Sequence, residues 1–331
     1  MKVIRSWRTT GMIAAIFIGL MLLLIPAYSV SGQGADRLKR EFPHLDLTKR
    51  SIDLAEIKSG GVPRDAIPAI MEANFLPVSE IRDLGDDEPV IFLTGQCGAF
   101  AFPYRILIWH EIVHHDQCGA PVAVTYCPLC NTSMVFDRRV GGKTFSFGTT
   151  GRLRHSDLVM YDHQTESFWQ QFTGEAIVGT MTGQTLAPVP ARIEAWRLFR
   201  EEFPDGQVLV PGNRSSRAYG DNPYQGYDSA PAPFLYRGKL PQKIEPMARV
   251  VRVGPRAWSL DYIRRNSPVT TESGMRIEWI AGQNSALDRR RISRGRDIGN
   301  VRVTRQQDDV AYSIDFAFAF FAFYPQGELT Q

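Results

Sequence analysis

The pattern of hydrophobic and polar positions changes along this chain. Between residues 88 and 190, short runs of β-branched and aromatic residues are separated by Gly, Pro and Asp. Such runs, spaced about 8–12 residues apart, predict strands joined by turns. Similar runs of β-branched and aromatic residues return over residues 248–324. The pattern therefore predicts a mainly β (α+β) protein with an antiparallel, meander or barrel-like β domain.

Other segments differ from this pattern. Residues 192–203 place apolar side chains at helical spacing and end at Pro204, whereas residues 211–247 are rich in Pro, Gly and Tyr without periodicity. A loop of that length is often functional, so it is a candidate lid over a cleft, or else a surface loop. The expected organisation is a signal peptide or anchor (1–32), a helical and polar lead-in (33–85) and one domain (86–326) divided into a first β half (86–190), a helix and long loop (191–247) and a second β half (248–326).

A weak internal repeat supports the division into halves. Residues 119–127 align without gaps with residues 274–282, and residues 101–106 loosely resemble residues 257–262. If the two β halves are related, the second has Gly282 where the first has Cys127. The second half would then lack the thiol site described below.

The first residues of the chain predict its compartment. Three basic residues precede an uncharged apolar run, residues 11–27, and small residues follow it. This is typical of a secretory signal peptide, and the run is also near the lower length limit for a membrane anchor. We therefore expect a periplasmic or secreted protein, in contact with the inner membrane only if this segment is retained. A net charge of +3 is too small to indicate a nucleic-acid partner.

Cys127-Pro-Leu-Cys130 is the most informative motif. Two thiols at this spacing can bind one soft metal ion, cycle between dithiol and disulfide, or form half of a zinc knuckle. Cys97 and Cys118 flank the segment 102–115, and we expect them to form a disulfide if it folds back. A zinc site using all four cysteines is disfavoured because the outer pair lacks knuckle spacing.

The nearest candidates to complete a metal site are His155, Asp157, Met134 and Met160. Two thiolates with His or Met suit copper or zinc. If residues 155–161 form one strand, His155, Asp157 and Tyr161 share a face. For each of these residues an ordinary structural role, in the core or in a turn, is the competing interpretation.

Two other clusters carry possible chemistry. His110-Glu111-Ile-Val-His114 matches the HExxH pattern of zinc hydrolases, which requires a helix. The β-branched residues from Arg105 to His115 favour a strand, on which the two histidines could not share one ion. Asp162 and Glu166 are a possible acid–base pair, although a turn capped by Asp162 explains the same residues.

Several segments together resemble the family known as domain of unknown function 3179. They are YRILIWHEIV (104–113), VTYCPLC (124–130), SDLVMYD (156–162), QTESFW (164–169), YGDNPYQGY (219–227) and the closing FAFYP. The resemblance covers about residues 85–326. It implies a bacterial or archaeal protein, often secreted, and brings no known activity. The motif positions that it marks are Cys127, Cys130, Asp157, Tyr161, Asp162 and Trp169. At the positions of His114 and His155 the family pattern usually has Asn, which weakens the case for either histidine as a metal ligand.

The sequence thus leaves three main hypotheses for one site. The first is soft-metal binding, copper or zinc, by Cys127 and Cys130 with His155 or Met160. The second is a thiol–disulfide enzyme at the same pair, for which Asp157 and Asp162 are further catalytic candidates. The third is a binding or structural module with two disulfides and a cleft. Cleft candidates are Tyr161, Trp169 and Tyr224, and the ligand is a metal or an unknown small molecule.

Overall fold

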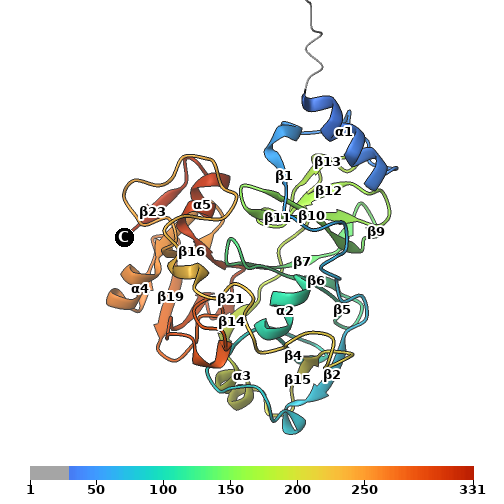
Figure 1. The fold of residues 1–331 in the computed structure, drawn as a ribbon. Helices are drawn as coiled ribbons and strands as arrows, with labels where there is room; N and C mark the ends of the chain where they lie inside the picture. Colours follow the sequence, from blue (N-terminus) through green and yellow to red (C-terminus); the bar gives the residue numbers. More distant parts are fainter. Residues whose placement is uncertain (1–29) are drawn as a thin grey trace, which may run out of the picture.

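The computed structural model describes residues 30–331 (Figure 1). Nearly all of the predicted signal peptide or anchor, residues 1–32, therefore lies outside the described residues. Within the described part, no helix is both long and apolar enough to cross a membrane. The described chain is mostly β, with antiparallel sheets and five short α-helices, which confirms the predicted fold class.

Two sheets of the first half hold the thiol motif. One is the three-stranded meander β5–β6–β7, in which β6 and β7 form a hairpin. The other is a five-stranded antiparallel sheet in the order β1-β10-β11-β12-β13. Their bounds are β5 Ile112–Asp116, β6 Pro121–Cys127 and β7 Thr132–Asp137, then β1 Ile57–Ser59, β10 Phe147–Arg154, β11 Asp157–Asp162, β12 Phe168–Gln170 and β13 Ala176–Val178.

The remaining strands form a long sheet, a four-stranded sheet and a small hairpin. The long sheet has the order β18-β19-β20-β14-β3-β4-β15-β2, with β21 beside β20. Its strands are β2 Asn74–Pro77, β3 Pro89–Gly95, β4 Gly98–Pro103, β14 Arg192–Ala195, β15 Gln207–Val210, β18 Val269–Thr270, β19 Met275–Ile280, β20 Asn300–Arg305 and β21 Asp308–Asp309. The four-stranded sheet contains β22 Ser313–Phe316, β16 Arg249–Val253, β17 Arg256–Ser259 and β23 Glu328–Thr330, and the hairpin pairs β8 Arg139–Val140 with β9 Lys143–Thr144.

The two halves repeat one connectivity. In the first, taken to include the strands β14 and β15 from residues 191–247, β14-β3-β4-β15 has β3 and β4 as a hairpin and β15 parallel to β4. In the second, β22-β16-β17-β23 has β16 and β17 as a hairpin and β23 parallel to β17. A three-stranded meander follows each hairpin, β5–β6–β7 or β18–β19–β20. The segments aligned in the sequence fall on equivalent elements, which supports the expectation of two related halves.

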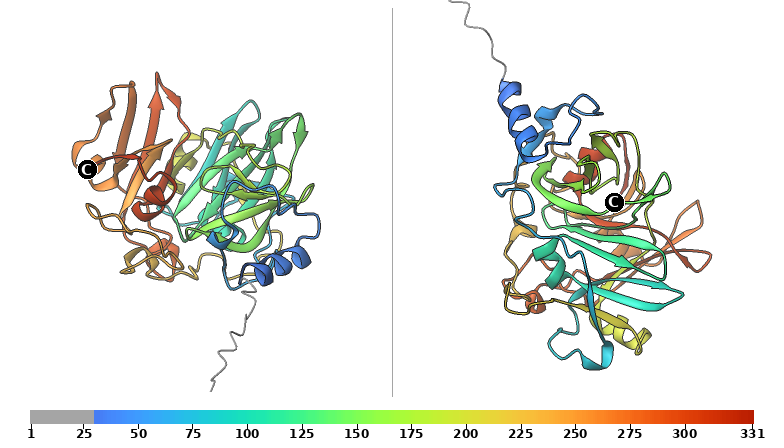
Figure 2. Two further views of the ribbon diagram at one scale, coloured as in Figure 1. Left: turned by 90° about the horizontal axis from the view of Figure 1, so that it is seen from above. Right: turned by 90° about the vertical axis from the view of Figure 1, so that its right-hand side faces the viewer.

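The halves also exchange strands, so they do not form separate layers. Strand β14 of the first half pairs with β20 of the second. Strand β22 of the second half is hydrogen-bonded to β7 and to the turn before it. Phe316 N donates to Cys130 O, and Ser133 N donates to Ser313 Oγ. The two lobes are visible side by side in Figure 2. One hydrophobic core runs through both and includes Tyr126 and Phe316.

Four of the α-helices continue directly from a strand. They are α2 Tyr104–His110, α3 Trp196–Glu202, α4 Leu260–Asn266 and α5 Ala317–Phe323, each seven residues long and preceded by an extended residue. The expected strand at residues 105–115 is therefore wrong for its first part. Ile106, Leu107 and Ile108 are buried, and the packing of a helix against the core outweighs their β propensity. The helix expected at residues 192–203 begins four residues later, after β14.

The lead-in lies against the first half, whereas the long loop contacts both halves: Tyr227 OH donates to Leu129 O, and Gly226 N donates to Asp288 O. Helix α1, Val30–Glu41, is followed by Phe42 and Leu45, which pack on β11, β12 and β13. The remaining helical pieces are single turns of 3-10 helix at Leu54–Glu56, Val78–Glu80, Tyr227–Ser229 and Ile292–Arg294. The loop 211–247 contains only the third of these, as its lack of periodicity indicates.

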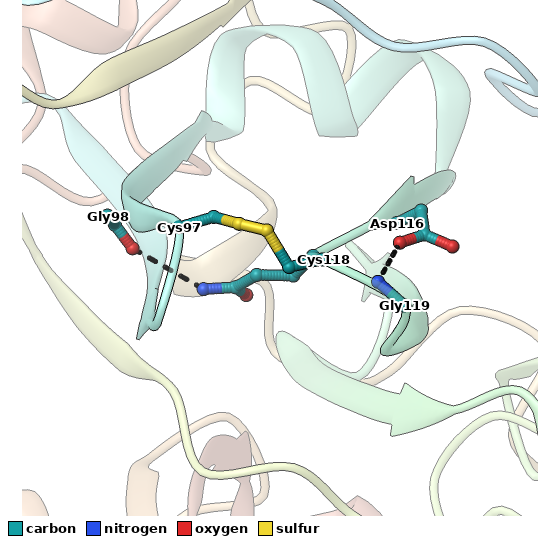
Figure 3. The surroundings of a disulfide bond; sticks show 6 residues. Cys97, Gly98, Asp116, Cys118 and Gly119 are labelled. Atoms are coloured by element: carbon teal, nitrogen blue, oxygen red, sulfur yellow. Dashed lines mark hydrogen bonds between the residues drawn. A yellow bond between two sulfur atoms is a disulfide. The ribbon is translucent and has the colours of Figure 1, made fainter.

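The expected disulfide between Cys97 and Cys118 is present (Figure 3). Cys97 lies in the turn between β3 and β4, and Cys118 in the turn between β5 and β6. The segment between them folds back through α2, which brings their Cα atoms to 6.1 Å. Asp116 accepts a hydrogen bond of 2.6 Å from Gly119 N in the second turn.

Candidate metal centre

The Cys-Pro-Leu-Cys motif forms the turn of the β6–β7 hairpin. Cys127 ends β6 opposite Thr132, and Asn131 takes the left-handed conformation (φ 55°) that closes the turn. Asn131 Nδ2 donates to Ile314 O at 2.7 Å, and Thr132 Oγ1 donates to Asp315 at 2.9 Å. Strand β22 of the second half therefore holds this turn in place.

Asp157 is the third member of the site. Its Oδ2 accepts hydrogen bonds from Gln170 Nε2 (2.6 Å) and from Phe172 N (2.9 Å). Its Oδ1 is buried and has no hydrogen-bond partner among residues 30–331. The thiols of Cys127 and Cys130 and a carboxylate oxygen of Asp157 lie within 4.8 Å of one another, all buried. A buried acceptor without a donor is costly, and a cation between the three groups would satisfy it.

Burial sets the protonation of this trio. Loss of solvent raises the pKa of both thiols, and it raises the pKa of Asp157 to about 7 despite the hydrogen bonds from Gln170 and Phe172 and the adjacent Cys127 thiol, which lower it. Without a cation, the thiols are therefore protonated at neutral pH. A metal ion reverses this preference, because thiolate and carboxylate are its ligands and their protons leave on binding. Two sulfur ligands and one oxygen ligand fit zinc, and the two sulfurs alone fit Cu(I).

Glu111 lies next to the trio. It follows α2 with a left-handed backbone (φ 59°), and its carbonyl accepts a 2.9 Å hydrogen bond from Tyr126 N, beside Cys127. Burial, and then the negative charge of Asp157, raise the pKa of the Glu111 carboxyl to about 8. A left-handed conformation is rare for a residue with a long side chain, and such strain is concentrated at functional sites.

A cavity of about 540 Å³ adjoins the site beneath the long loop. Glu111 and Leu129, the residue between Pro128 and Cys130, line it together with Tyr224, Tyr227 and Phe234 of the loop. Tyr227 OH donates to Leu129 O (3.1 Å) and accepts from Phe234 N (3.1 Å). Ser156 Oγ also donates to Phe234 O. The loop 211–247 is thus bonded to residues on both sides of the site, and Tyr224 lines the cavity.

The other candidate ligands lie in different surroundings. His155 is in the turn before β11, not on the strand, and its ring faces Phe323 while Nε2 lies 3.4 Å from Glu56. Only its backbone carbonyl faces the Cys130 thiol, at 4.0 Å. Met160 is buried in β11 opposite Trp169 and belongs to the hydrophobic core, as does Met134. The residues brought together are Cys127, Cys130 and Asp157.

The polar cluster after β11 is a turn. Asp162 accepts hydrogen bonds from Thr165 N (2.5 Å), Thr165 Oγ1 (2.9 Å) and Trp169 Nε1 (2.8 Å). Glu166 instead binds Arg64 at 2.7 Å. Tyr161 OH donates to Asp65 at 2.6 Å. Within the described residues, Tyr161 and Trp169 do not line the cavity. Asp162 therefore caps the turn, the simpler of its two interpretations.

The HExxH segment does not form the helix that zinc hydrolases need. His110 ends α2, where its Nε2 is 2.8 Å from Tyr219 OH, whereas His114 lies on β5 and its Nε2 accepts from Phe147 N at 2.9 Å. Glu111, between them, faces the cavity. In the sequence, Glu111 stands out only as part of this motif, and nothing there connects it with the cysteine site.

The fold and the site define the class of protein. It is a two-part, antiparallel β protein with a buried Cys-Pro-Leu-Cys turn, and two acidic residues, Asp157 and Glu111, lie near that turn. Residues 64–327 match the family described as protein of unknown function (DUF3179), and the chain belongs to that family. No curated protein and no solved structure matches the chain.

Proposed function

We propose that the protein binds one soft metal ion, copper or zinc, through Cys127, Cys130 and Asp157. The observation that carries this proposal is the buried trio itself, with its three ligand atoms within 4.8 Å. The unpartnered Oδ1 of Asp157 supports it, since buried polar atoms are nearly always satisfied. The hydrogen bonds that fix Oδ2 would orient the carboxylate as outer-sphere partners of a ligand do.

A thiol–disulfide enzyme at the same pair is the second candidate. The contact between the Cys127 and Cys130 side chains favours it, because a disulfide needs adjacent sulfurs. The raised pKa of both thiols argues against it, since exchange requires a thiolate that solvent can reach. Metal binding is the better proposal because the ion itself supplies the charge that deprotonates the thiols.

We further propose that the protein acts outside the cytoplasm, in the periplasm or as a secreted protein. The Cys97–Cys118 disulfide supports this, because such bonds persist in oxidising compartments. The signal-like residues 1–32 point the same way. N-terminal sequencing of the protein exported by its host tests this location and shows whether the segment is removed.

One experiment separates the candidates. The protein is purified from an oxidising compartment, and its metal content and free thiols are measured on the same sample. The Cys127→Ser variant is the test, and a double Cys97→Ser, Cys118→Ser variant is the matched control, since it removes the other two cysteines. We expect about one copper or zinc ion per chain, lost in Cys127→Ser and kept in the control.

Two other outcomes would overturn the proposal. Protein without metal and without free thiols has two disulfides, which favours a structural or binding module. Protein without metal, but with two thiols that exchange with added disulfides, favours the redox enzyme. Exposure of metal-free, reduced protein to one equivalent of Zn²⁺ or Cu⁺ distinguishes loss of metal during purification from the absence of a site.

A further inference from the structure

The cavity beside the metal centre has the dimensions of a ligand site. Its volume of about 540 Å³ lies within the range of small-molecule pockets, about 300–1,000 Å³. The wall is largely apolar and includes Val62, Ile67, Leu129, Leu158 and Phe234. At Gly151, a left-handed residue on the same wall, a Cβ atom would lie 2.2 Å from Val62 O, so only glycine allows the wall to approach this closely.

Two charged side chains line this cavity, and their pairing differs. Arg152 Nη2 binds Glu41 at 2.6 Å, which pairs its charge within the protein, while Arg152 Nε is buried without a hydrogen-bond partner among residues 30–331. Glu111 is only 7% exposed, and no hydrogen bond or ion pair joins its carboxyl group to another residue between 30 and 331. Glu111 is therefore a buried acidic group on an apolar wall without an internal partner. Without a ligand it keeps its proton at neutral pH, and a cation bound beside it would let it release that proton to solvent.

The groups around Glu111 favour a cation as that partner. Tyr224, whose phenol interacts electrostatically with Glu111, and Tyr227 contribute aromatic rings to the same wall. The faces of such rings attract organic cations. An anion would lie against Glu111, and the Arg152 charge is already paired with Glu41, although Arg152 Nε still lacks a hydrogen-bond partner among the described residues. A neutral alcohol would fill the apolar space but gain no charge pairing.

We infer that this cavity binds a small organic amine, with its ammonium group against Glu111 and its apolar body against Leu129, Leu158 and Phe234. Binding does not require the metal, although it is compatible with one. Two thiolates and one carboxylate outweigh the charge of a Zn²⁺ or Cu⁺ ion, so the loaded centre stays net negative and does not repel the amine.

Three matched probes test the inference by calorimetry on the purified protein. Cyclohexylmethylamine, cyclohexylmethanol and cyclohexanecarboxylate share one apolar body and differ in charge. We expect the amine to bind at least about tenfold more tightly than the alcohol, a difference of about 1.4 kcal/mol, and the carboxylate not to bind. Equal binding of amine and alcohol, or binding of neither, would overturn the inference without any variant.

Variants then identify the residue and separate this site from the metal. Glu111→Gln, nearly the same in shape, should reduce amine affinity about tenfold and leave alcohol affinity unchanged. Glu245→Gln, which lines a different cavity, is the control and should change neither. In Cys127→Ser the preference for the amine should persist. Its loss there would mean that the amine coordinates the metal directly, which would contradict the assignment to Glu111.

Discussion

The backbone N–H of Phe316 donates a 2.9 Å hydrogen bond to the carbonyl of Cys130. Phe316 ends β22 in the second half of the chain, and Cys130 belongs to the thiol turn of the first. Asp315, its neighbour on β22, accepts from Thr132 in the same turn. The geometry of the proposed metal site therefore depends on the packing of both halves, although both thiols come from the first.

Asp315→Asn is expected to destabilise the fold severely. Asp315 is buried, binds Arg252 at 2.5 Å and also accepts from Thr132 and Ser313. Removing its charge leaves Arg252 buried without a counter-charge, which typically costs about 3–5 kcal/mol. Urea denaturation measures the change. Asp261→Asn, which removes an exposed partner of Arg264, is the control and should cost less than about 1 kcal/mol. A similar small effect for both variants would contradict the prediction.

Removing the Cys97–Cys118 disulfide should lower stability without removing the metal. The bond closes a loop with a sequence separation of 21. The entropy of such a loop in the unfolded chain corresponds to about 3 kcal/mol. Denaturation of the double Cys→Ser variant measures this loss, and its metal content should equal that of the wild type. Loss of metal in this variant would show that the outer pair belongs to the site after all.

Local patterns predicted much of this fold. The β-branched and aromatic runs at residues 121–126 and 157–161 correspond to nearly all of β6 and of β11. The strand expected at residues 105–110 was wrong because Ile106 and Ile108 are buried by tertiary packing, which propensity does not encode. The strand-to-helix connection recurs four times, yet its sequences share little, since α5 is entirely apolar whereas α3 and α4 carry several charged residues.

The candidate site shows the same limit. The spacing of Cys127 and Cys130 defines the turn, and Asp157 was among the nearby polar residues considered with it. Nothing local distinguished Asp157 from His155, because the choice depends on where β11 begins. Glu111 approaches Cys127 through the pairing of β5 with β6, in which Ile112 faces Thr125. That contact depends on strand register, which one sequence alone does not specify.

Asp157→Asn should distinguish zinc from copper. Zinc accepts carboxylate oxygen as a ligand, whereas Cu(I) is satisfied by two thiolates. We expect zinc affinity to fall at least about tenfold and Cu(I) affinity to change much less, as measured by competition with chelators of known affinity. Asp162→Asn is the control on the same strand, since Asp162 caps a turn and should leave both affinities unchanged. Unchanged zinc affinity in Asp157→Asn would exclude the carboxylate as a ligand.

The stability of the metal-free protein should decline as pH rises, and Glu111 should account for part of that decline. Burial raises the pKa of Glu111 from 4.5 to about 8 in the folded state. Between these values the unfolded chain ionises while the folded protein keeps the proton, so stability falls by about 1.4 kcal/mol per pH unit. Below pH 4.5 both states are protonated and the penalty disappears.

Glu111→Gln removes this titration, so the test is the difference in the free energy of unfolding between the variant and the wild type. Urea denaturation with a chelator, at several values between pH 5 and 8, should show the variant gaining stability relative to the wild type as pH increases. The contribution of His114 to the free energy of unfolding cancels in this difference. Burial lowers the pKa of His114 to about 3, so His114 destabilises the fold in acid in both proteins. Asp157, with a pKa raised to about 7, titrates in both proteins. Parallel pH profiles would contradict the prediction, because they would show that Glu111 has the same pKa in the folded and unfolded states.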